Sequence, residues 1–151
     1  MTPKTKRTIL FTVLCLVAIG AGVGYYLYNK KPLNPNDVSP KEKTTSITLY
    51  QAFAKDTVDA KSKFSRKDEV VEVSGVVTGI SQNADKKPVI LLKTNVEGAS
   101  VNCTMEGTAE NIKEGDSIDL KGFCTGMGAS DADLGLLADV YMIRCYKINK
   151  F

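Results

Sequence analysis

The sequence contains no histidine and no tryptophan among its 151 residues. The absence of histidine removes the most common general base and the most common metal-binding side chain of proteins. The cysteines show no CxxC spacing that would form a zinc site without histidine. A catalytic cysteine would also lack its usual imidazole partner. The sequence therefore predicts a protein that is not an enzyme and that binds no metal or cofactor.

Most of the chain also lacks an excess of positive charge. The formal net charge is +3, but residues 1–44 alone hold seven basic and two acidic side chains. The remaining 13 basic and 15 acidic residues leave a net charge of −2. A non-specific nucleic-acid binder is expected to carry a basic face that displaces phosphate counterions. Nucleic acid is therefore the less favoured partner.

A long uncharged segment is present near the N-terminus, at residues 9–28. As a helix it would span about 30 Å, the thickness of the hydrocarbon core of a membrane. Residues 1–8 include Lys4, Lys6 and Arg7, and a basic N-terminus tends to stay in the cytoplasm. The pattern predicts a single-pass signal-anchor helix in the inner membrane, with an extracytoplasmic C-terminal domain. A signal peptide cleaved near Ala18-Ile19-Gly20 is the alternative.

The next two segments differ in composition and period. Residues 29–45 hold three of the five prolines among polar side chains, which predicts a semi-extended linker before a folded domain at 46–151. From Thr48 to Phe64, apolar side chains recur at three- and four-residue steps, so one helix of about four turns is expected. Thr48 and Gln51 form its predicted capping box. Its apolar stripe is expected to close one end or side of a barrel.

Residues 69–81 predict a long strand that bends. One face of this strand carries Val71, Val73 and Val77 together with Gly75 and Gly79. Glycine weakens a strand unless the backbone must coil or pass close to another group, which indicates a strand shared by both halves of a barrel. Four further strands are predicted at 89–93, 100–105, 117–126 and within 134–148. The expected fold is mainly β with α, an α+β protein with a five-stranded OB-like barrel and an N-terminal packing helix, preceded by the single transmembrane helix.

The order of these segments resembles a known family. AFAKDTVDAKSKF leads into EVVEVSGVVTGI, followed by ILLK, VNC, KEGDSIDLKGFCTG and a final strand that ends in cysteine. This arrangement resembles the tRNA anticodon-binding-like (tRNA_anti-like) OB-fold family of bacterial proteins, over roughly residues 47–148. The resemblance implies an OB barrel behind a membrane anchor or signal. It implies no reaction and assigns no binding residues.

Three cysteines in the predicted domain make an odd number, so one thiol stays free if two of them bridge. The third and fifth strands of an OB barrel are parallel neighbours, and Cys103 and Cys145 each lie near the end of one of them. We therefore prefer a Cys103–Cys145 disulfide. Either pairing with Cys124, and three reduced core thiols, are the alternatives.

The candidate binding residues are outward aromatic and basic side chains on different strands: Lys93, Lys121, Phe123, Tyr141 and Arg144. Such a set can stack a base or a sugar, although packing against the helix also explains the aromatic residues. The sequence predicts a membrane-anchored, non-enzymatic OB-fold binding module that faces the cell envelope. Its expected partner is an envelope protein, a glycan or a small ligand. A single-stranded nucleic-acid-binding OB-fold protein is the alternative.

Overall fold

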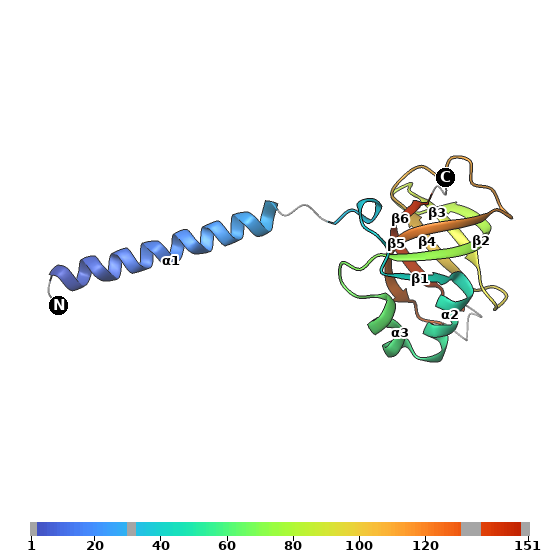
Figure 1. Cartoon of the computed structure of the whole chain (residues 1–151), viewed down its shortest axis with the longest axis horizontal. Coiled ribbons are helices and arrows are strands. Elements are labelled where there is room, and N and C mark those ends of the chain that lie inside the picture. The colour runs from blue at the N-terminus through green and yellow to red at the C-terminus, as the bar shows by residue number, and fades with distance from the viewer. Residues whose placement is uncertain (1–2, 30–32, 131–136, 149–151) are drawn as a thin grey trace. The chain divides into compact units, whose positions relative to one another are not determined.

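The computed structural model describes residues 3–29, 33–130 and 137–148, with side chains from Thr12 onward. The chain divides into two compact units, Met1–Leu33 and Asn34–Phe151. The first unit contains the helix α1 (Pro3–Asn29), and the second contains the strands and the other helices (Figure 1).

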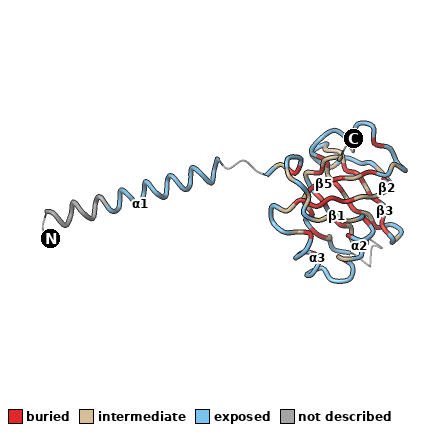
Figure 2. Tube along the Cα trace, in the orientation of Figure 1, coloured by how far each residue is buried: buried red, intermediate tan, exposed pale blue. Residues whose placement is uncertain are grey.

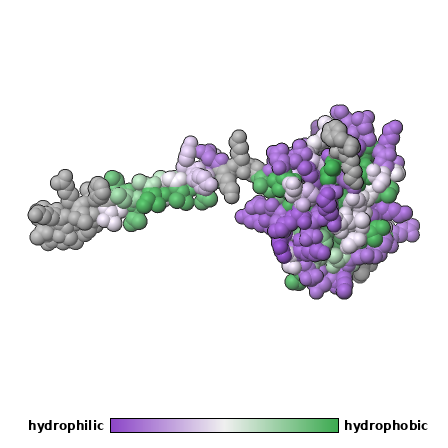
Figure 3. All heavy atoms as spheres, in the orientation of Figure 1, coloured by the Kyte–Doolittle hydropathy of each residue, from purple (hydrophilic) through white to green (hydrophobic). Residues whose placement is uncertain are grey.

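The helix α1 has 27 residues, and its window Thr12–Asn29 has a mean hydropathy of 1.4. None of this window is buried inside the protein, and its apolar side chains are seen along the helix in Figure 3. Since a helix rises about 1.5 Å per residue, α1 is longer than the roughly 30 Å of a hydrocarbon core. It has the length and composition of a membrane span or of a signal sequence. The basic residues Lys4, Lys6 and Arg7 lie in its first turns, where only the backbone is described.

Five strands of the second unit close into a barrel. They are β2 (Val71–Gln82), β3 (Pro88–Lys93), β4 (Ser100–Met105), β5 (Ser117–Met127) and β6 (Val140–Lys147). Their order is β2-β3-β4-β6-β5, and β5 pairs again with β2. Only β4 and β6 are parallel among these five pairings. This is the order of an OB fold, so the predicted barrel and α+β class are confirmed. The last strand starts later than predicted, and residues 134–136 of its expected range lie outside the described part.

The strand β2 is shared by both halves of the barrel, as predicted. Its first half, through Val76, pairs with β5, and its second half, from Val77, pairs with β3 across a bulge. At Gly75 the backbone passes close to Ser46, the first residue of the helix α2 (Ser46–Lys55), which precedes β2 in the chain: a Cβ at Gly75 would lie 2.7 Å from Ser46 Oγ. The Ser46 hydroxyl donates a hydrogen bond to the Lys93 carbonyl at 2.6 Å. Glycine at position 75 therefore lets the helix sit directly on the barrel wall.

Two helices, α2 (Ser46–Lys55) and α3 (Thr57–Phe64), replace the single predicted helix. The break lies at Asp56, whose backbone is extended, with φ −153°. Its carboxylate accepts hydrogen bonds from the amides of Val58 and Asp59, at 2.8 and 3.0 Å. Aspartate is a favoured N-cap because it satisfies free amides of the first turn. Asp56 thus ends one helix and begins the next.

The start of α2 also differs from the prediction. Thr45 is the N-cap, and its hydroxyl accepts from the Thr48 amide at 3.1 Å, so the Thr48–Gln51 capping box is wrong. The apolar stripe is confirmed, because its residues are buried where the helices cover the barrel (Figure 2). Helix α2 packs on β2, β3, β4 and β6, whereas α3 packs on β5. The buried stripe residues are Leu49, Phe53, Ala60 and Phe64.

The predicted linker is shorter than expected, because residues 34–45 pack on the barrel. We call this segment the strap. It contains a short 3-10 turn, η1 (Pro35–Asp37), with Pro35 buried, and a strand, β1 (Glu42–Thr45), that pairs in parallel with β2. Across this pairing the Lys43 ammonium lies 3.0 Å from the Glu72 carboxylate. The folded unit therefore begins at Asn34 and not at residue 46.

The contact at Gly75 predicts the effect of a substitution. We expect Gly75→Ala to lower the free energy of unfolding by about 2 kcal/mol, because the added methyl group displaces Ser46 or the strand. Thermal unfolding of the detergent-solubilised chain, followed by circular dichroism, measures the change. Gly107→Ala is the control, since a Cβ there meets no atom within 4 Å. Equal stability of the two variants would contradict the close approach.

Candidate functional site

The outer wall formed by β3, β4 and β6 is the candidate face. Buried residues alternate with outward ones along these strands. Leu91 on β3 pairs with Asn102 on β4, which pairs with Tyr141 on β6, so the three form one row across the wall. In the next row Lys93 pairs with Ser100. Tyr141 is 44% exposed, which leaves a ring available for contact on a mostly polar surface.

A hollow of about 640 Å³ lies at one end of the candidate face, beside the turn that joins β3 to β4. Its lining includes Thr78, Leu91 and the segment 93–100. The buried Thr94 hydroxyl holds the turn, at 2.9 Å from the carbonyl oxygens of both Val96 and Ala99. Lys93 is exposed at this hollow, and its ammonium makes no ion pair within the described residues. The hollow therefore offers a positive charge beside a rigid turn.

Asp139 fixes the start of β6 against β4. Its carboxylate accepts hydrogen bonds from the Ser100 amide at 2.7 Å and from the Asn102 side-chain amide at 3.1 Å. The Ser100 hydroxyl also donates to the Asn102 side-chain oxygen at 2.7 Å. Tyr141 follows two residues later, and a Cβ at Gly128 would lie 2.9 Å from its ring. The polar groups of Ser100, Asn102 and Asp139 thus hold β4 and β6 together in the wall.

The predicted binding residues do not form one cluster. Lys93 and Tyr141 belong to the candidate face, whereas the Arg144 guanidinium lies over the Phe123 ring, 5.9 Å from its centre. Arg144 has a left-handed backbone, with φ 53°, at a bulge in β6. The Lys121 ammonium donates to a backbone carbonyl of the strap at 2.6 Å. The Lys121 ammonium is therefore already occupied by the strap.

Two residues that organise the candidate face were missed by sequence reasoning. Thr94 sits in a Thr-Asn-x-x-Gly segment, a composition in which hydroxyl-bonded turns are common, so a local signal was present. Asp139 carries no local signal, because its partners on β4 lie 37 and 39 residues away in the chain.

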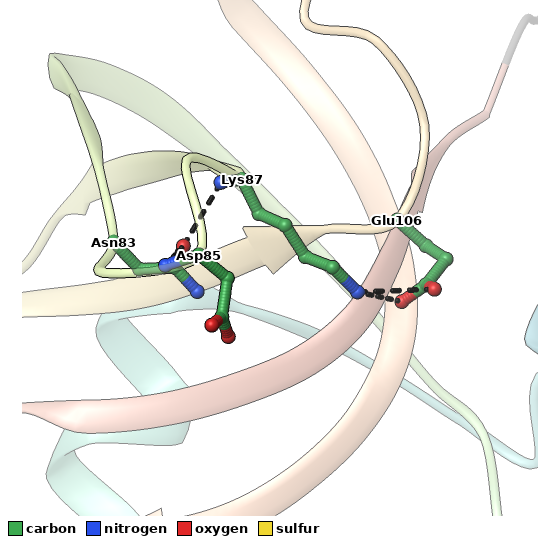
Figure 4. A network of polar contacts seen from close by, with 4 residues as sticks. All are labelled: Asn83, Asp85, Lys87 and Glu106. Atoms are coloured by element: carbon green, nitrogen blue, oxygen red, sulfur yellow. Dashed lines mark hydrogen bonds and ion pairs between the residues drawn. The ribbon is translucent and has the colours of Figure 1, made fainter.

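The turn between β2 and β3 is also held by a side chain, as Figure 4 shows. The Asn83 side-chain oxygen accepts from the amides of Asp85 and Lys87, at 3.0 and 2.9 Å. The Lys87 ammonium then lies 3.1 and 3.2 Å from the two carboxylate oxygens of Glu106, which follows β4. This ion pair connects the β2–β3 turn to the loop that follows β4, and it neutralises the charge of Lys87.

Three cysteines, Cys103, Cys124 and Cys145, are buried in the barrel as free thiols. Interaction with the Cys103 thiol, together with burial, raises the pKa of Cys145 well above its usual value. Burial also raises the pKa of Cys124, whose sulfur lies 3.5 Å from the Ser65 hydroxyl. The preferred Cys103–Cys145 disulfide is therefore not present in this structure, where both cysteines are free thiols on neighbouring strands.

Within the described residues, no group of three or more His, Cys, Asp or Glu side chains is placed to hold a metal ion. The site thus consists of a hollow, a lysine, a tyrosine and a rigid polar row on an OB barrel. Comparison with protein families adds a match of residues 1–136 to the model of the tRNA_anti-like family. The chain belongs to the tRNA_anti-like family. No curated protein matches the sequence significantly.

The hydrogen bond from Lys121 to the strap of this tRNA_anti-like barrel gives a testable prediction. We expect Lys121→Met to speed amide hydrogen exchange in the strap about tenfold, because the charged hydrogen bond to the Asn36 carbonyl is lost. Hydrogen exchange read by mass spectrometry on peptides from residues 34–45 measures this. Lys93→Met is the matched control, since its ammonium is exposed at the hollow. Equal exchange in both variants would show that Lys121 does not hold the strap.

Proposed function

We propose that this protein is a non-enzymatic binding module that is anchored in the inner membrane by α1 and displays its OB barrel on the envelope side. The length and composition of α1, with Lys4, Lys6 and Arg7 before its apolar part, support this orientation. The candidate face would bind an envelope protein, a glycan or a small ligand.

The hollow beside the β3–β4 turn is the observation that carries this proposal. OB folds bind extended ligands across the wall made by their second and third barrel strands, which are β3 and β4 here. The hollow opens on this wall, and Lys93 and Tyr141 supply a charge and a ring on the same surface. Because Thr94 and Asp139 already hold the wall, a ligand would not need to order it, and less entropy is lost on binding.

Single-stranded nucleic acid is the second candidate. The Phe123 ring with Arg144 beside it, and the exposed ring of Tyr141, are groups on which bases can stack. Five of the 20 basic residues precede Asn34, whereas all 17 acidic residues follow it, so the barrel unit has a net charge of −2. This charge and the occupation of Lys121 make nucleic acid the weaker candidate.

Photo-crosslinking in intact cells tests the candidate face. A photoreactive phenylalanine analogue replaces Tyr141 or Lys93 in the full chain, and the same analogue at Val58 is the control. Val58 is 80% exposed on α3 and lies off the candidate face. We expect adducts from positions 141 and 93 that exceed those from position 58, as read by mass spectrometry. If the three positions give the same adducts, the candidate face is not the binding surface.

The two candidate functions are separated by oligonucleotide titration. Fluorescence anisotropy of a labelled single-stranded oligonucleotide, at low salt and micromolar protein, should not change if the leading proposal holds. Nucleic acid becomes the first candidate if binding occurs, weakens steeply with salt and is lost in Phe123→Ala. Nuclease treatment of the cellular adducts gives an independent answer, since only a nucleic-acid adduct would be shortened.

A further inference from the structure

A bulge in β6 brings two consecutive side chains together on the outer side of the barrel. Two residues of β6, Arg144 and Cys145, oppose the single residue Gly122 of β5. Cys145 is buried, and a Cβ at Gly122 would lie 2.7 Å from its sulfur, so Cys145 points into the barrel. Ile143, in contrast, is 42% exposed and pairs with the outward Phe123, whose ring lies under the Arg144 guanidinium. We call Phe123, Ile143 and Arg144 the outer patch.

The charges near the outer patch are mostly positive. β6 carries Arg144 and Lys147 and no acidic residue. On β5, Lys121 lies two residues before Phe123 and on the same face. The one acidic residue of β5, Asp119, lies a further two residues away, and its carboxylate accepts a hydrogen bond from a hydroxyl group of β2. A partner of this wall is therefore expected to be anionic.

The guanidinium of Arg144 is placed to bind such an anion. Among the described side chains it forms no ion pair. Stacking over the Phe123 ring uses the planar face of the guanidinium, whereas its N–H donors point outward from its edges. These donors match the oxygen atoms of a phosphate group, two at a time. An apolar side chain, Ile143, lies next to this phosphate-binding group.

The chain that leaves α1 joins the barrel at the same wall. The turn η1 packs on β5 and β6, and its Asn36 carbonyl accepts a hydrogen bond from Lys121. Side chains two residues apart on a strand, such as Lys121 and Phe123, are separated by about 7 Å. The five residues that follow Asn29, up to Asn34, span at most about 18 Å. A membrane that holds α1 is therefore within reach of the outer patch.

We infer that the outer patch docks on the surface of the membrane that α1 crosses, with the Arg144 guanidinium on an anionic phospholipid headgroup and Ile143 and Phe123 beside the upper acyl chains. Arginine suits this position because its stem is apolar and its end is charged. Since α1 already holds the barrel at the membrane, a weak contact is sufficient. The inference rests on the proposed anchoring by α1 and not on the ligand of the candidate face.

Base stacking on single-stranded nucleic acid would use the same ring and guanidinium. Such binding depends on many phosphate contacts, and the barrel unit has a net charge of −2. A lipid surface requires only local positive charge with apolar side chains beside it. The outer patch has this composition, so the membrane is the occupant that the observations favour.

An introduced tryptophan tests the docking, because the chain has none. Ile143→Trp and, as control, Val58→Trp on α3 are made in the full chain and reconstituted into vesicles of phosphatidylglycerol and phosphatidylcholine. Part of the phosphatidylcholine carries bromine on its upper acyl chain, which quenches tryptophan on contact. We expect brominated vesicles to lower the emission from position 143 about twofold, as for a side chain buried at the acyl boundary. The emission from position 58 should not change.

Removal of the charge isolates the headgroup contact. In the Ile143→Trp chain, Arg144→Gln should lower the ratio of docked to undocked barrel about fivefold, because each basic side chain near an anionic surface contributes about this factor. Vesicles without phosphatidylglycerol should have a similar effect. Lys63→Gln is the matched control, since Lys63 lies over the Phe64 ring at 5.1 Å from its centre but belongs to α3. It should leave the quenching unchanged.

Several results would overturn the inference. These are equal quenching at positions 143 and 58, or quenching that survives both Arg144→Gln and the loss of phosphatidylglycerol. A blue shift of the tryptophan emission that bromine does not quench, and that appears only at a high ratio of protein to lipid, would instead assign the patch to a second copy of the chain. If circular dichroism shows that Ile143→Trp does not fold, Thr125→Trp takes its place, because Thr125 is exposed on β5 two residues from Phe123.

Flotation of the same vesicles separates this inference from the proposed function. The full chain should rise with the vesicles in a density gradient, also after an alkaline wash that removes peripheral proteins. If it does not rise, anchoring by α1 fails and the docking fails with it. If it rises and position 143 is not quenched, the anchoring stands and the docking alone is overturned.

Discussion

Closure of the barrel through β2 is the constraint on which the rest of the structure depends. One strand must pair with β5 along its first half and with β3 along its second. This requires a bend, and the bulge after Val77 provides it. With the sheet closed, the inner side chains of all five strands meet in one continuous core. The closed barrel and its core fix the shape of the outer wall of β3, β4 and β6. This wall can then act as a binding surface without a ligand to order it.

Side-chain oxygens that accept backbone hydrogen bonds organise the loops around this barrel. Asp56 separates two helices, Asn83 closes the turn after β2, and Asp139 holds the start of β6 to β4. Each acceptor satisfies an amide that the strand or helix pattern leaves free, and such amides are costly if unpaired. The result is a wall whose polar groups are already committed, which leaves Lys93 and Tyr141 as its most available side chains.

The parts of the fold that follow a local period could be predicted from sequence. Alternating residues placed the strands, and the three- and four-residue steps placed the stripe from Leu49 to Phe64. The helix break was missed because this period continues through Asp56, although aspartate before Thr57 is itself a capping signal. The strap and Asp139 depend on partners far along the chain, which no local pattern contains. Contact of the Lys121 ammonium with the strap likewise needed the folded barrel.

The parallel pairing of β1 with β2 gives the barrel a mechanical property. Four residue pairs join the two strands in register, from Glu42 with Val71 to Thr45 with Ser74. A pull along β1 from its N-terminal end would load these pairs in shear, so that their hydrogen bonds resist together and do not open one after another. Tension on the chain ahead of Asn34 would first load the contact of Asn36 with Lys121 and would then reach β2, the strand that closes the barrel, through these four pairs.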